Sequence, residues 1–183
     1  MYNECLRILR PTPNKSHYIF NLRDLSKLIL GICRADKTKV HSENIGRLWG
    51  HEANRIFVDR LLPEDKGTIE NLISNMGKKW GKNMNKVYFS DILSPSHERS
   101  YEEINDLEKV NLSVTTSLNN YNMVSDRPMD LVLFNYALEH ILIILRIIRE
   151  AKGHALLVGL GGSGRKSFSY LSSSIAEFSQ FTL

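Results

Sequence analysis

The sequence lacks the features that mark several classes of protein. Its two cysteines, Cys5 and Cys33, are too few for a disulfide-stapled scaffold, so we expect reduced thiols in an intracellular protein. No secretory signal is expected, because charged and polar side chains already occur within residues 1–10. No internal repeat is visible, which leaves a globular chain of about one domain or slightly more.

A metal-binding pattern is also missing. The six histidines have no cysteine or carboxylate at metal-ligand spacing, so we expect no metal ion. His51 and Glu52 are adjacent, but no second histidine follows at the offset of a metalloprotease motif. Glu52 is therefore expected to partner Arg55 or a neighbouring helix.

Long hydrophobic runs are scarce. The most apolar stretch, residues 131–148, contains Asn135, Glu139, His140 and Arg146. Each charge near the centre of a bilayer costs about 2.5–3.5 kcal/mol, so a buried helix is the better interpretation. No membrane partner is expected.

Charge of one sign is not in large excess. The net charge is +4 and uneven, since residues 1–90 carry 16 basic and 9 acidic side chains whereas residues 91–183 carry 8 and 11. This distribution excludes a general polyanion-binding surface. Basic residues surround Trp80, but a solvated helix face explains them better than a nucleic-acid site, so no nucleic-acid partner is expected.

The first half of the chain is dominated by amphipathic helical patterns. Asn21 is a candidate N-cap for one helix, Ser42 begins the strongest, and Pro63 ends it before Glu64 and Asp65 start a third. The apolar positions at helical spacing are Leu22, Leu25, Leu28, Ile29 and Ile32, then Ile45, Leu48, Trp49, Ala53, Ile56, Phe57 and Leu61, and then Ile69, Leu72, Ile73 and Met76. These three helices predict a small bundle.

A looser segment and another helix follow. Residues 87–89 are either a short strand or an apolar anchor. Residues 100–118 are expected to form a weaker helix, and residues 119–128 a polar linker. Asp130 is then expected to cap a helix that reaches about Glu150.

The last part of the chain is the most informative for function. Residues 154–158 are a short apolar run that predicts a buried parallel strand. The run leads into Gly-Leu-Gly-Gly-Ser-Gly over residues 159–164, and then into a helix over residues 165–178. A strand, a glycine-rich turn and a helix are the setting of a phosphate-binding loop, in which backbone N–H groups face an anion at a helix N-terminus.

The side chains of this loop fit the phosphate-binding pattern less well. When Gly159 and Gly164 are the fixed glycines of G-x-x-x-x-G-K-[ST], Arg165 occupies the lysine position and Lys166 the Ser/Thr position. Arg165 can reach a phosphate, but Lys166 cannot hold Mg²⁺, and Ser167 lies about 100° further around the helix. The interpretations are a glycine-rich turn without a ligand, nucleotide binding without efficient hydrolysis, and, least favoured, hydrolysis by this chain. No catalytic residue is assigned.

Four blocks of sequence resemble the motor ring of dynein heavy chains, in matching order. The blocks are HYIFNLRDLS at 17–26, LWGHEANRIFVDRL at 48–61, LVLFN at 131–135 and GHALLVGLGGSG at 153–164. The form Gly-Leu-Gly-Gly-Ser-Gly-Arg is similar to axonemal heavy chains more than to cytoplasmic ones. The resemblance implies the helical lid of the third AAA+ module followed by the first part of the fourth module.

The resemblance also implies an ATP or ADP site. The arginine of Asn-Leu-Arg-Asp is the second sensor of the lid in this family, which gives Arg23 a contact with the phosphates of the third module's nucleotide. Leu131 and Val132 stand where AAA+ proteins flank the adenine. The implied loop residues of the fourth module are Gly159, Leu160, Gly161, Gly162, Ser163, Gly164, Arg165, Lys166 and Ser167. Lys166 makes a magnesium site in this loop unexpected.

The expected fold is mainly α with a small α/β part, an AAA+ helical lid bundle followed by the truncated start of a P-loop NTPase α/β subdomain. The expected divisions are a connecting segment over 1–13, the lid over 14–90, a linker with a weak helix over 91–128, and the start of the next module over 129–183.

The resemblance implies a fragment of a motor ring that contributes to ATP binding and to microtubule-based movement in cilia, without ATPase activity of its own. The implied partners are the rest of the heavy-chain ring and, through the full-length protein, dynein intermediate and light chains and microtubules. The implied location is the cytoplasm and cytoskeleton, in the ciliary axoneme. The alternative is a non-catalytic AAA+ interaction module with a vestigial nucleotide loop.

Overall fold

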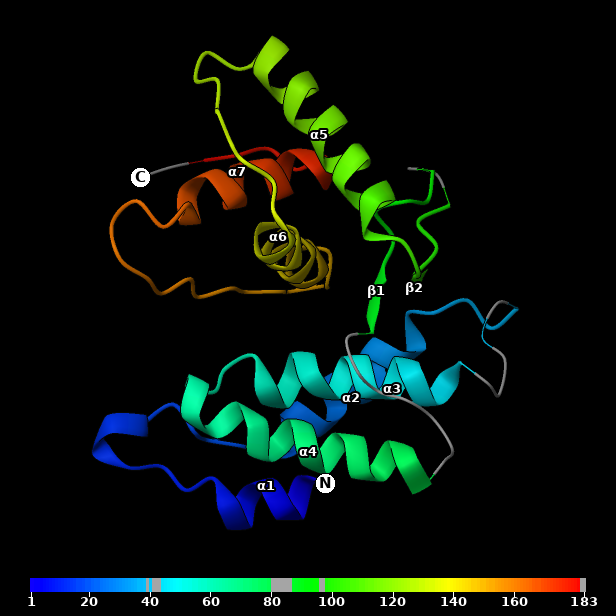
Figure 1. The fold of residues 1–183 in the computed structure, drawn as a ribbon, viewed down its shortest axis with the longest axis vertical. Coiled ribbons are helices and arrows are strands. Elements are labelled where there is room, and N and C mark those ends of the chain that lie inside the picture. Colours follow the sequence, from blue (N-terminus) through cyan, green and yellow to red (C-terminus); the bar gives the residue numbers. More distant parts are fainter. Residues whose placement is uncertain (39, 41–43, 80–86, 96–97, 182–183) are drawn as a thin grey trace. The chain divides into compact units, whose positions relative to one another are not determined.

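The computed structural model describes residues 1–38, 40, 44–79, 87–95 and 98–181. The chain divides into two compact units, which are described separately: unit 1 comprises residues 1–89 and 100–104, and unit 2 comprises residues 90–99 and 105–183. Helices dominate both units, as Figure 1 shows, and the described strands form one small two-stranded sheet. The expectation of a mainly α chain is confirmed.

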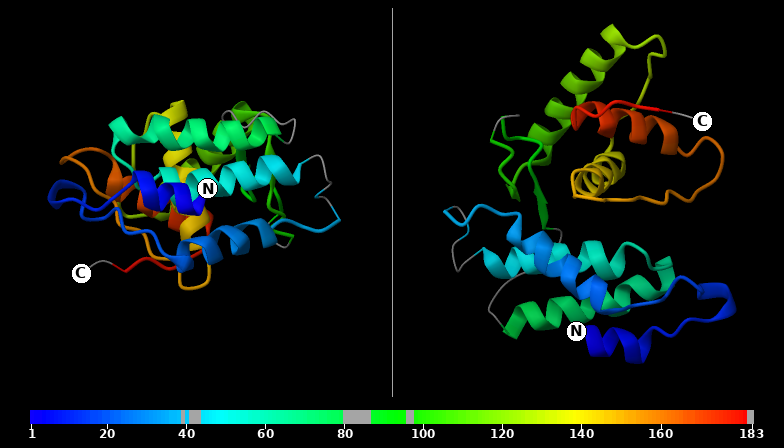
Figure 2. Two further views of the ribbon diagram at one scale, coloured as in Figure 1. Left: turned by 90° about the horizontal axis from the view of Figure 1, so that it is seen from below. Right: turned by 180° about the vertical axis from the view of Figure 1, so that it is seen from behind.

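Unit 1 contains a helical bundle. Its helices and helical turns are α1 (Tyr2–Ile8), η1 (Pro13–Lys15), α2 (Leu22–Cys33), α3 (Ile45–Ala53), the π-helical turn η2 (Asn54–Val58) and α4 (Pro63–Lys79). Figures 1 and 2 show α3 and α4 side by side. The buried core between the helices consists of Cys5, Leu9, Tyr18, Phe20, Leu28, Ala53, Ile56, Phe57, Val58, Leu61, Ile69 and Ile73.

Local sequence signals set the helix boundaries in unit 1. The side chain of Asn21 accepts a hydrogen bond from the Arg23 amide, and the Asp24 carboxylate accepts one from the Asn21 amide, so the expected cap is a reciprocal capping box. Pro63 is the first residue of α4, where its missing N–H costs nothing. Ser42 lies outside the described residues, and Asn44 is the N-cap of α3.

Helix α2 buries only part of the apolar face that its sequence pattern gives it. Leu28 is buried, but Leu22 is 69% exposed and Ile29 is 53% exposed. The described helices of unit 1 cover only the side of α2 that carries Asp24, Leu28 and Gly31. The rest of its apolar face is left on the surface.

The segment after residue 87 differs in part from the expectation. Strand β1 (Tyr88–Ser90) confirms the candidate strand, but it pairs with β2 (Glu102–Ile104), where the start of a weak helix was expected. Within β2, Glu102 is exposed and Ile104 is buried, which is the alternation of a strand with one buried face.

Helix α5 (Leu107–Val124) begins and ends later than expected. Asp106 caps it by accepting a hydrogen bond from the Glu108 amide at 2.9 Å. Residues 119–124, expected as linker, are helical. The side chain of Asn122 bonds both the N–H and the C=O of Met129, at 2.8 Å each, which stabilises the turn beyond the helix.

Unit 2 is formed by three described helices, α5, α6 (Asn135–Ile148) and α7 (Arg165–Ile175). Helix α6 is shorter than expected, because it begins after Phe134 and not at Asp130. No helix among the described residues is long and apolar enough to cross a bilayer. The buried apolar side chains of these helices include Val110, Val114, Leu118, Ala137, Leu138, Ile141, Leu142, Ile144, Leu145 and Leu171.

The strand expected over residues 154–158 is absent from the described structure. Leu156 is 89% exposed and Val158 is 85% exposed, and Figure 2 shows the segment between α6 and α7 as a long connection without an arrow. A strand is stabilised by hydrogen bonds to a neighbouring strand, and no other described segment pairs with this one. The apolar pattern alone therefore does not produce a strand here.

Candidate functional site

The glycine-rich loop forms a tight turn that opens helix α7. Gly162 and Gly164 have φ values of +79° and +78°, a backbone region that side-chain-bearing residues rarely adopt. The Ser163 amide donates to the Leu160 carbonyl at 3.3 Å, which closes the turn. Gly164 is the N-cap of α7 and supplies no capping side chain. An anion can serve as the cap at such a helix start.

A side chain would be crowded at two of the glycines. A Cβ atom on Gly159 would lie 2.9 Å from the Ser163 hydroxyl oxygen, and one on Gly164 would lie 3.2 Å from the ring of Phe168. Gly161 differs, because a Cβ atom there would meet nothing within 4 Å and its φ is not in the left-handed region. The loop therefore has two positions fixed by backbone conformation and one that tolerates substitution.

Arg165 occupies the lysine position and folds back over the loop. Its Nη2 donates to the carbonyl oxygen of Leu160 at 3.1 Å, and its Cδ lies 3.5 Å from the Cβ position of Gly159. The guanidinium is therefore placed against the turn that would face a phosphate. Lys166 is exposed and Ser167 is half-buried on the first turn of α7.

A row of aromatic rings joins the start of α6 to this loop. The ring centres of Phe134 and Tyr136 are 6.2 Å apart, those of Tyr136 and His140 are 4.1 Å apart, and those of His140 and Phe168 are 6.5 Å apart. Phe168 packs against Gly164. Sequence reasoning missed these rings, although the four-residue spacing of Tyr136 and His140 puts them on one helix face.

The other candidate residues lie apart from the loop in the chain. Leu131 and Val132 belong to unit 2 and precede α6; Leu131 is half-buried and Val132 is exposed. Arg23 belongs to unit 1, on the exposed first turn of α2. Its neighbour Asp24 forms an ion pair with Arg60 at 2.6 Å. The nucleotide contact of Arg23 stays a prediction.

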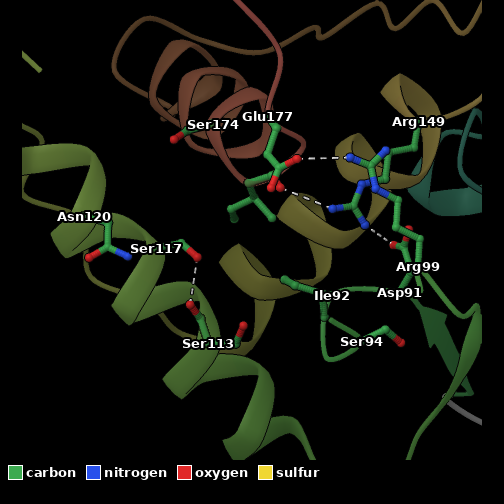
Figure 3. Close-up of a pocket in the computed structure, with 11 residues that line it drawn as sticks. Asp91, Ile92, Ser94, Arg99, Ser113, Ser117, Asn120, Arg149, Ser174 and Glu177 are labelled. Carbon is green, nitrogen blue, oxygen red and sulfur yellow. Dashed lines mark hydrogen bonds and ion pairs between the residues drawn. The ribbon is translucent and has the colours of Figure 1, made fainter. Parts of the chain in front are cut away.

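A cavity of about 310 Å³ in unit 2 lies at the opposite end of α7 from the loop (Figure 3). It is lined by Asp91, Ile92, Ser94, Arg99, Ser113, Ser117, Asn120, Arg149, Ser174, Ile175 and Glu177. Arg99 pairs with Glu177 at 3.2 Å, and Arg149 pairs with Asp91 and donates to the Ile175 carbonyl. Because each arginine already faces a carboxylate, this cavity is a poor phosphate site.

The chain matches two family models, one in its first half and one at its C-terminal end. Residues 1–67 match the dynein heavy chain ATPase lid domain, and residues 129–183 match the P-loop-containing dynein motor region D4. The chain belongs to the dynein heavy chain family. The glycine loop lies within the D4 match, and Arg23 lies within the lid match.

Axonemal dynein heavy chains are similar to almost the whole chain. It is 39% identical over 194 residues to human dynein axonemal heavy chain 2, covering 100% of this chain and 4% of that protein. It is 41% identical to human dynein axonemal heavy chain 1 (96% of this chain, 4% of that protein) and 36% identical to human dynein axonemal heavy chain 3 (94% and 5%). The chain thus spans about one twentieth of these relatives. The expected axonemal resemblance, with an AAA+ lid and the start of a P-loop subdomain, is confirmed, and the chain corresponds to a piece of the dynein motor ring.

Proposed function

We propose that residues 159–167 hold the phosphates of ATP or ADP, in the fourth AAA+ module of a dynein motor ring whose third-module lid is the bundle of unit 1. The observation that carries the proposal is the pair of left-handed glycines, Gly162 and Gly164, on the turn that opens α7. Leu131 and Val132 would flank the adenine, and Arg23 would contact the nucleotide of the third module.

Most of the phosphate affinity should come from the backbone. The uncapped start of α7 offers N–H groups and the positive end of the helix dipole, a charge interaction worth about 0.3–1 kcal/mol. Arg165 adds a cation beside the loop and can keep its bond to Leu160 while a second nitrogen of its fork reaches a phosphate. Lys166 offers a cation where a hydroxyl would hold Mg²⁺, so binding should not depend on the metal.

In the full-length protein, this piece would contribute nucleotide binding to microtubule-based movement in the ciliary axoneme. The relatives are named as axonemal dynein heavy chains, which supports the location and the motor class. The proposed partners are the rest of the ring, the dynein intermediate and light chains, and microtubules. The proposed divisions remain 1–13, 14–90, 91–128 and 129–183, and the piece is not an autonomous motor.

The test is calorimetric titration of ADP and ATP, with and without Mg²⁺, on the 183-residue chain and on a longer heavy-chain segment that holds the whole fourth module. Gly162→Ala should weaken binding about fivefold to tenfold, because a left-handed alanine costs about 1 kcal/mol or more. Gly161→Ala is the matched control, because its Cβ atom has open space and no positive φ, and it should change the affinity less than twofold.

A double variant tests the metal dependence separately from nucleotide binding. Arg165→Lys combined with Lys166→Thr should make ATP binding depend on Mg²⁺, because a hydroxyl returns to the metal-facing position. If neither nucleotide binds the longer segment at millimolar concentration and this double variant does not rescue binding, the loop is vestigial.

A non-catalytic interaction module is the second candidate, and the surface of α2 favours it. Leu22, Ile29 and Leu30 are exposed along this helix, and apolar patches of that kind mark contacts with other domains. In this case Leu22→Asp and Ile29→Asp should disturb association with neighbouring ring segments, whereas the loop variants should have no effect on any measured binding.

A further inference from the structure

A buried polar network in unit 1 lies outside the nucleotide site. It consists of His51 and Glu52 on α3, Tyr101 just before β2, and the carbonyl of Val87 just before β1. His51 Nδ1 lies 2.9 Å from the Val87 oxygen, His51 Nε2 lies 3.1 Å from the Tyr101 hydroxyl oxygen, and that oxygen lies 2.7 Å from Glu52 Oε1. The exposed fractions of His51, Glu52 and Tyr101 are 4%, 0% and 5%.

The structure gives Glu52 a hydrogen-bond partner that the sequence did not predict. Arg55 pairs with Asp59 at 3.3 Å, four residues along the same helical segment. Glu52 instead contacts Tyr101, 49 residues away. The adjacent His51 and Glu52 therefore both face the β1–β2 pair.

Three protons are needed for all three contacts of this network to be hydrogen bonds. A carbonyl oxygen can only accept, so His51 Nδ1 carries a proton toward Val87. Each of the other two contacts also needs one proton between its heavy atoms. All three contacts are satisfied when His51, Tyr101 and Glu52 hold three protons together, either as an imidazolium facing a carboxylate or as a neutral imidazole facing a protonated carboxyl. With only two protons, the Tyr101 hydroxyl can donate to either His51 Nε2 or Glu52 Oε1, but not to both. The remaining contact then brings together two acceptors without a proton between them.

The unfolded chain holds fewer protons at neutral and alkaline pH. The ordinary pKa values are about 4.3 for glutamate, 6.5 for histidine and 10 for tyrosine. Between about pH 7 and pH 9, the three unfolded side chains therefore keep two protons, one fewer than the three contacts of the folded network require.

We propose that His51, Tyr101 and Glu52 share a proton that is taken up on folding, so that the attachment of the β1–β2 pair to α3 weakens as the pH rises. The sign follows from linkage, because a state that binds more protons loses stability with increasing pH. The chain passes between its two units at residues 89–90, 99–100 and 104–105. All three of these positions are in or next to the β1–β2 pair. The proton-sharing network therefore acts on the part of the chain that connects the units.

Four charged side chains among the described residues lie on the elements around the network. The Arg34 guanidinium, at the end of α2, lies 5.1 Å from the centre of the Tyr101 ring. Arg47 on α3 pairs with Glu103 on β2, and Glu102 is exposed on the other face of β2.

The test is urea unfolding of the 183-residue chain between pH 6.5 and pH 8.5, followed by tryptophan fluorescence. Both tryptophans, Trp49 and Trp80, are in the sequence of unit 1. Glu52→Gln keeps the contacts without the shared proton, because its amide can donate to Tyr101, whose hydroxyl then donates to a neutral His51. Glu103→Gln is the matched control, a carboxylate of the same unit whose partner is Arg47.

We expect the unfolding equilibrium constant of the wild type to rise about tenfold per pH unit relative to that of Glu52→Gln. The Glu103→Gln chain should keep the wild-type pH dependence. Equal pH dependence in the wild type and Glu52→Gln would overturn the proposal.

NMR chemical shifts of the wild type test the proposal without any variant, and so remain available when Glu52→Gln does not fold. The nitrogen shifts of His51 and the carboxyl carbon shift of Glu52 at pH 8 should show either an imidazolium or a protonated carboxyl. A neutral imidazole together with an ionised carboxylate at that pH would contradict the three-proton count.

Discussion

The left-handed conformation of Gly164 predicts a measurable local cost of substitution. In Gly164→Ala, the left-handed backbone of an L-residue costs about 1–2 kcal/mol. Lower entropy of the unfolded chain returns about 0.4–1 kcal/mol. The new Cβ atom also lies 3.2 Å from the ring of Phe168, so the ring must shift by a few tenths of an ångström. The expected net loss is about 1 kcal/mol.

Gly161→Ala provides the matched comparison within the same loop. Its Cβ atom meets no atom within 4 Å and its φ is not positive, so only the entropic gain of about 0.4–1 kcal/mol remains. The two alanine variants should therefore differ by about 1.5 kcal/mol, with the Gly164 variant the less stable.

Amide hydrogen exchange of Phe168 is the appropriate assay, because this amide donates to the Gly164 carbonyl at 2.8 Å and reports the first turn of α7. Exchange should be about fivefold faster in Gly164→Ala, the factor that corresponds to about 1 kcal/mol, and unchanged or slower in Gly161→Ala. If both variants protect Phe168 equally, the loop does not hold the conformation on which the nucleotide proposal depends.

Two more predictions concern unit 1. Burial raises the pKa of the Cys5 thiol to about 11, whereas Cys33 is exposed. A thiol reagent at pH 8 should therefore label Cys33 rapidly and Cys5 only after unfolding. Rapid labelling of both cysteines would contradict the packing of α1. The hydrogen bond from Lys15 lowers the pKa of Asp65 most, and the hydrogen bond from Tyr18 lowers it further. The contribution of Asp65 to stability is therefore complete above the ordinary pKa of about 3.9 and is lost as the pH falls through the lowered value. Acid titration of Asp65→Asn should lack that component, and an unchanged acid transition would count against the pair.

Features that depend on neighbouring residues could be predicted from the sequence alone. Asn21 and Asp24 are three residues apart, and they form the capping box of α2. The glycines of residues 159–164 produce the expected turn at the start of α7, because left-handed φ values are a property of single residues. The mainly α fold and the family were also accessible from these local patterns and from the four matching blocks.

Features that depend on distant partners were decided only by the tertiary structure. Residues 154–158 have the apolar pattern of a strand but no described partner, so they remain exposed. Residues 102–104 form a strand because β1 is beside them, although a weak helix was expected. Glu52 meets Tyr101 across 49 residues, and no local spacing encodes that contact. A hydrogen bond or a buried face exists only when both partners are brought together, and only the folded chain determines which distant partners meet.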